Sequence, residues 1–159
     1  MKFLSGTKKD AAERLLTFQL NAREEALLLA TLRHYPVMGN GQHRISQDPK
    51  TAGSAEQRLL EESMAQQRVE HRRKLDELFH APQRYFKGAA GERRLVLTGV
   101  QLEWLLQILN DIKVGSWVQL GCPELEKGSP LKLTRLNARS FQAMHLSGEF
   151  QSALLDAVK

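Results

Sequence analysis

The fold depends most on residues 15–29, which are LLTFQLNAREEALLL. Apolar and polar side chains alternate over the first six positions, and this alternation predicts a half-buried strand. Asn21 then precedes Glu24 by three residues, the spacing of a capping box, in which each side chain bonds the backbone N–H of the other residue. We therefore expect a strand followed directly by a helix over Phe18–Arg33.

The same pattern returns at residues 94–109, which are RLVLTGVQLEWLLQIL. Thr98 and Gln101 form a second capping box, and a second strand-helix unit is expected over Leu95–Lys113. A lone strand leaves its backbone groups unpaired, so the two strands are expected to pair with each other. The expected sheet is short and two-stranded and joins residues about 15–20 with about 94–98, in a direction that the pattern leaves open.

Two more helices complete the predicted fold. Ser54 and Gln57 form another capping box, which opens a helix running to about His80. The last helix is expected over Ala138–Val158, where Gly148 costs about 1 kcal/mol relative to alanine and so permits a break. Together these elements predict a mainly α, four-helix bundle-like fold as a single domain over residues 1–159.

The predicted loops and the central helix follow from composition. Glycine and proline mark a mobile loop at about 36–53 and a second loop at about 82–92. The helix that starts at Gly99 is apolar around most of its circumference, so we expect it in the middle of the bundle.

Composition favours a soluble protein of the cytoplasm. The chain has 159 residues, a formal charge of +5 and a single cysteine, so no internal disulfide can form. No apolar stretch reaches the length of a membrane span or of a signal-peptide core. The positive charge permits an anionic partner without requiring one.

The segment Leu109-Asn-Asp-Ile-Lys-Val, preceded by Trp104-Leu105 and followed by Leu120-Gly121, resembles an uncharacterised, mainly actinobacterial protein family. Lys113 stands where that family usually has arginine, and Gln119 where a second basic residue is common. Some members are loosely labelled transcriptional regulators. The resemblance implies a shared helical fold and no particular activity.

No motif for catalysis, metal or nucleotide binding is present, and we expect no cofactor. The five histidines never stand four residues apart, and one cysteine cannot make a zinc site. His71 is predicted to be a hydrogen-bonded core histidine, with a buried proton-transfer group as the alternative. Asn110 and Asp111 are expected to bond backbone groups, or else to line a small-ligand site. Trp104 and Trp117 are expected in the core, with an interface anchor as the alternative.

A basic cluster provides the candidate nucleic-acid site. Acidic residues interleave with it, so a solvated helix face is the favoured interpretation. No helix-turn-helix pattern accompanies it. The candidate residues are Arg68, Arg72, Arg73, Lys74, Arg84 and Lys87.

The sequence thus predicts a non-enzymatic protein that acts through protein–protein association, as a homodimer or with another protein. A nucleic-acid-binding regulator that uses Arg68–Lys74 is the alternative. A small-ligand site near Asn110 and Asp111 is the third hypothesis.

Overall fold

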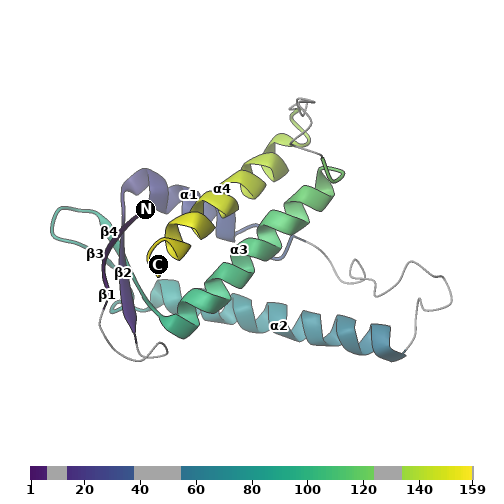
Figure 1. The fold of residues 1–159 in the computed structure, drawn as a ribbon, viewed down its shortest axis with the longest axis horizontal. Coiled ribbons are helices and arrows are strands. Elements are labelled where there is room, and N and C mark those ends of the chain that lie inside the picture. Colours follow the sequence, from purple (N-terminus) through teal and green to yellow (C-terminus); the bar gives the residue numbers. More distant parts are fainter. Residues whose placement is uncertain (7–13, 38–54, 124–133, 159) are drawn as a thin grey trace.

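Four helices pack against a four-stranded antiparallel sheet in the computed structural model, which describes residues 1–6, 14–37, 55–123 and 134–158 (Figure 1). The strand order in the sheet is β1-β2-β4-β3. The elements are, in chain order, β1 (Lys2–Gly6), β2 (Leu15–Leu20), α1 (Ala22–Leu32), α2 (Ala55–His80), β3 (Tyr85–Lys87), β4 (Arg93–Thr98), α3 (Gly99–Gln119) and α4 (Ala138–Leu155).

The expected pairing of the two alternating segments is present at the centre of this sheet. β2 and β4 run antiparallel, with Leu15 opposite Thr98 and Phe18 opposite Leu95. The predicted fold class is nevertheless wrong. The fold is mixed α/β, because β1 adds to the free edge of β2 and β3 to the free edge of β4.

The two missed strands lie at the edges of the sheet. β1 is mostly exposed and β3 has three residues, so neither shows the alternation that marks a half-buried strand. An edge strand needs only one partner for its backbone, and a short one can form without burying an apolar face. β3 interrupts the predicted loop at about 82–92, whose other residues are turns or irregular.

One face of the central strands is buried in the core. Leu16, Phe18 and Leu20 of β2 alternate with half-buried residues, and Leu95 and Leu97 of β4 do the same. The helices lie on one side of the sheet in Figure 1, and α1, α3 and α4 each contact a strand. The core therefore lies between the sheet and the helices.

Both capping boxes of the strand-helix units are confirmed. The Asn21 side chain accepts from the Glu24 N–H and the Thr98 side chain accepts from the Gln101 N–H, and each bond is reciprocated. α1 ends at Leu32, one residue before the end of the predicted unit at Arg33. The Ser54 cap and almost all of the loop at about 36–53 lie outside the described residues.

α3 is central, as its composition predicts. Four of its side chains are wholly buried: Leu105, Ile108, Leu109 and Ile112. Figure 1 shows α4 beside it, running in the opposite direction. α4 is continuous through Gly148, so the glycine does not break the helix. α2 crosses below α3, and its N-terminal turns extend beyond the other helices (Figure 1).

Candidate functional site

Tyr35 and His71 form a buried polar pair where the end of α1 meets α2. The two residues are 1% and 5% exposed, and the Tyr35 hydroxyl lies 3.2 Å from His71 Nδ1. Arg72 holds the backbone at this point, because its guanidinium donates to the Tyr35 carbonyl. The cluster therefore joins two elements through hydrogen bonds that water cannot easily replace.

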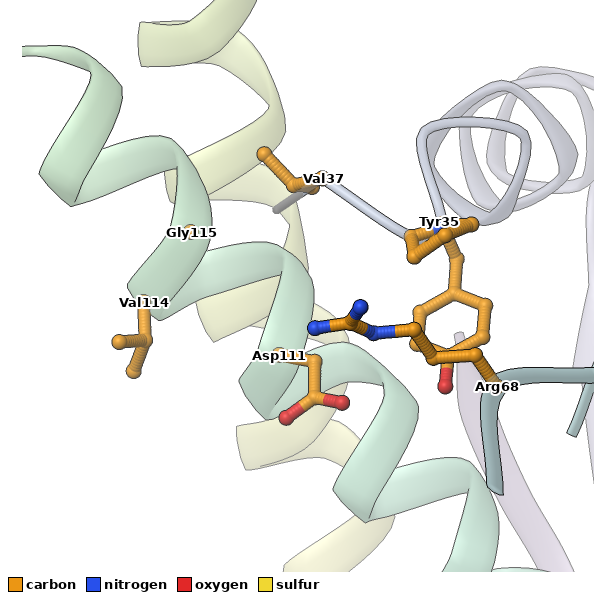
Figure 2. Close-up of a pocket in the computed structure, with 7 residues that line it drawn as sticks. Tyr35, Val37, Arg68, Asp111, Val114 and Gly115 are labelled. Carbon is orange, nitrogen blue, oxygen red and sulfur yellow. The ribbon is translucent and has the colours of Figure 1, made fainter. Parts of the chain in front are cut away.

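A cavity of about 40 Å³ adjoins this pair (Figure 2). Its polar lining comes from Arg68 of α2 and Asp111 of α3, and Figure 2 shows the Arg68 side chain extending past the Tyr35 ring toward Asp111. This volume suits one or two water molecules and is far below that of an ordinary ligand pocket.

The pair is uncharged near neutral pH. Burial, with the Asp111 carboxylate as the next cause, raises the pKa of Tyr35 to about 12, and Arg68 opposes that change. Burial also lowers the pKa of His71, and the nearby Lys74 ammonium lowers it further, against the opposing charges of Asp111 and Glu70. The pair therefore consists of a neutral phenol and a neutral imidazole that are hydrogen-bonded to each other.

The three residues predicted as a polar cluster are thus only partly brought together. His71 is buried and hydrogen-bonded, and Asp111 lies close enough to influence it. Asn110 is exposed and does not line the cavity. Tyr35 completes the cluster, although no pattern in the sequence connects it with a histidine 36 residues later.

The basic cluster does not form one open face. Arg72, Arg73 and Lys74 are consecutive on a helix, so their side chains point about 100° apart around its axis. Arg73 binds both Glu70 and Glu77, and Glu70 also pairs with Lys74.

Two other basic candidates share surfaces with these. Arg68 lines an open groove with Arg72, Arg73 and Asp76, and it also lines the small cavity with Asp111. Arg84 lines a shallow surface with Lys74 and Glu77. Lys87 is exposed on the edge strand β3. The cluster predicted from the sequence is therefore divided among several surfaces, most of them with acidic neighbours.

The most distinctive surface lies around Trp117. This side chain is 39% exposed whereas Trp104 is 7% exposed, so the core prediction is right for Trp104 and wrong for Trp117. Val114 and Val118, one helical turn and one residue away, are 45% and 41% exposed. Trp117 Nε1 donates to the Pro123 carbonyl at 3.2 Å, which holds the ring in place.

An open groove of about 640 Å³ runs between α3 and α4 at this surface. Gly148 leaves space in its α4 wall, and the stacked rings of Phe141 and His145 continue along α4. We call this surface the Trp117 face. It consists of Lys113, Val114, Trp117 and Val118 from α3 with Met144, His145, Gly148, Glu149 and Ser152 from α4.

The signal for the Trp117 face is present in the sequence. α3 is apolar nearly all round, and the neighbouring elements of a small domain cannot cover every side of such a helix. The uncovered side is then an exposed apolar surface. Sequence alone does not show which side that is.

No family model, no curated protein and no solved structure matches this chain. Within the described residues, no helix has the length and apolar character needed to cross a membrane. The same residues contain no group of three or more histidine, cysteine, aspartate or glutamate side chains that could hold a metal ion. The polar cluster, the basic cluster and the Trp117 face are therefore the candidate sites among the described residues.

Proposed function

We propose that this protein acts without catalysis, by associating with protein through the Trp117 face. The observation that carries the proposal is the exposed indole of Trp117 in an open apolar groove. Tryptophan is among the side chains that most often dominate the binding energy of protein interfaces.

The shape of the surface supports the same function. Val114, Trp117 and Val118 stand on one side of a regular helix whose opposite side is fixed in the core. Such a surface is already ordered before binding, so little conformational entropy is lost when a partner covers it. Contiguous exposed apolar residues beside polar ones are typical of interaction sites.

The non-catalytic part of the proposal rests on the polar cluster. Tyr35 and His71 are bonded to each other beside a cavity of about 40 Å³. A substrate would have to displace part of the core to reach them. Cys122 is exposed and free, which fits a protein of the reducing cytoplasm.

The two other hypotheses receive less support. Glu70 and Glu77 neutralise part of the basic cluster, which weakens the case for nucleic acid. The small-ligand hypothesis near Asn110 and Asp111 is limited by the small cavity and by the exposure of Asn110.

Photocrosslinking in the native host tests the proposal without assuming which protein binds. A benzoylphenylalanine in place of Val118 should give a discrete crosslinked product, and Trp117→Ala should remove it. The matched control carries the same group at Gln66, which is exposed on α2. Absence of a product at position 118, or equal products at both positions, would overturn the proposal.

A further inference from the structure

We infer that the partner of the Trp117 face is a second copy of this chain, related by a two-fold axis parallel to α3 and α4. In this dimer Trp117 of each copy lies beside Met144 of the other, and Lys113 of each copy pairs with Glu149 of the other. The inference rests on the proposed function and adds the identity and arrangement of the partner.

The first step is the alignment of α3 with α4 inside one copy. Ser140 Oγ donates to Gln119 Oε1 at 2.9 Å near one end of the pair, and Gln151 Nε2 donates to the Leu106 carbonyl at 3.3 Å near the other. Between them, a Cβ built on Gly148 would lie 3.8 Å from Lys113 Cε.

The helices are antiparallel, so moving along α3 by one residue corresponds to moving back along α4 by one residue. Trp117 follows Lys113 by four residues and Met144 precedes Gly148 by four. Trp117 is therefore level with Met144, and Lys113 is level with Gly148 and Glu149. By the same count Val114 is level with Ser147, two residues from His145, whereas the Gln119–Ser140 bond places Val114 level with His145 itself.

The second step is the effect of the two-fold axis. A rotation by half a turn about an axis parallel to the helices keeps each residue at its own level and exchanges the two sides of the groove. α3 of one copy then faces α4 of the other. Trp117 consequently meets Met144 across the interface, and the four helices have only antiparallel neighbours, as in an up-down bundle.

Charge makes this arrangement self-complementary. Lys113 is exposed on the α3 side of the groove and Glu149 on the α4 side, at the same level. No ion pair between these two side chains is present within one copy. The two-fold axis brings Lys113 opposite Glu149 twice, once on each side of the interface, which satisfies the self-complementarity of an isologous contact.

Gly148 presents no side chain at the level of Lys113, and the end of the Lys113 side chain of the same copy lies beside it. In the dimer Lys113 therefore turns from its own α4 to the α4 of the facing copy. A two-fold axis perpendicular to the helices would instead place α3 against α3 and α4 against α4. That arrangement leaves Lys113 without Glu149 and is the alternative that the experiment has to separate.

The first experiment measures the oligomeric state by sedimentation equilibrium on the full chain. At high micromolar concentration the chain is expected to be a dimer. Trp117→Ala should raise the dissociation constant of this dimer by about thirtyfold or more. A strict monomer overturns the inference. If photocrosslinking at position 118 then captures a different protein, the proposed function stands and only the identity of the partner is wrong.

The second experiment uses disulfide formation to test which helices face each other in the dimer. Cys122 is exposed and is first replaced by serine in every variant. Val114→Cys and His145→Cys proteins, each prepared separately, should form a covalent dimer only when mixed. A covalent dimer from Val114→Cys protein alone would show α3 against α3 and overturn the inference, as would no covalent dimer after mixing.

The third experiment reverses the proposed charges. Lys113→Glu and Glu149→Lys should each weaken the dimer by about tenfold, because each places like charges opposite one another twice. The double variant should return to within about threefold of the native dissociation constant. Both positions are exposed, so the monomer is expected to fold normally, and circular dichroism checks this. A double variant no tighter than the single ones overturns the pairing.

Discussion

The buried contact between Tyr35 and His71 allows a direct test of what holds α1 to α2. Tyr35→Phe removes the hydroxyl and leaves His71 Nδ1 without its partner at 3.2 Å. We expect a loss of about 1–2 kcal/mol in the free energy of unfolding, measured by urea denaturation, because a buried polar atom then lacks a hydrogen bond. In a His71→Leu background the same change should cost clearly less, because the partner is already gone. Equal costs in both backgrounds would contradict this account.

The pH dependence of stability follows from the His71 imidazole. Its pKa in the folded chain lies below the ordinary 6.5, chiefly because of burial. The unfolded chain therefore binds more protons as the pH falls below about 6.5, and stability falls with it. Above that value both states are neutral at this position and the effect is absent.

We compare the free energy of unfolding at about pH 7.5 with that at about pH 5.5. Both pH values lie above the range in which ordinary carboxylates titrate. The native chain should lose stability between these values, and His71→Gln should lose less. Some loss remains in the variant, because burial, with Arg139 as a second cause, also lowers the pKa of His34. An unchanged loss in the variant would show that His71 does not contribute.

The polar cluster shows how far single residues can be predicted. A histidine on the apolar side of a helical pattern predicts a buried, hydrogen-bonded side chain, and this is what His71 is. Its surroundings include Asp111, 40 residues later, and Tyr35, 36 residues earlier. Contacts between helices depend on how those helices cross, and no local spacing contains that information.

At the scale of elements, the success of prediction depends on burial. β2 and β4 alternate strongly because one face of each is in the core, and their pairing was predictable. β1 and β3 form the edges of the sheet and bury little apolar surface, so the sequence did not predict these two strands or the four-stranded sheet. The caps at Asn21 and Thr98 were predictable because a capping box uses residues only three apart.

Two glycines give opposite predictions for the same substitution. Gly148 lies inside α4, where a new Cβ would meet only the end of the Lys113 side chain at 3.8 Å. Gly148→Ala should therefore raise the free energy of unfolding by about 0.5–1 kcal/mol. Gly121 has a φ of +81°, which alanine rarely adopts. Gly121→Ala should therefore lower the free energy of unfolding by about 1 kcal/mol or more. Urea denaturation at low protein concentration measures both, and a loss at Gly148 would contradict the expectation.

At the scale of the whole molecule, α3 has two different environments. Its inner side holds the core together through Leu105, Ile108 and Ile112, and its outer side carries Val114 and Trp117 into an open groove. The composition of α3 predicted its central position but could not distinguish these sides. Within the described residues no element covers this outer apolar side of α3. If the proposed partner covers it, assembly contributes to the stability of the fold.

In a dimer of this kind the melting temperature depends on protein concentration. Only the folded chain associates with a second copy, so association stabilises the folded state. Dilution by about a hundredfold should therefore lower the melting temperature of the native protein. Trp117→Ala should abolish this dependence. Trp104→Phe is the matched control, since Trp104 is buried: it should lower the melting temperature at every concentration and leave the dependence in place. Differential scanning calorimetry measures these melting temperatures. A native melting temperature that does not change with concentration would contradict the proposed dimer.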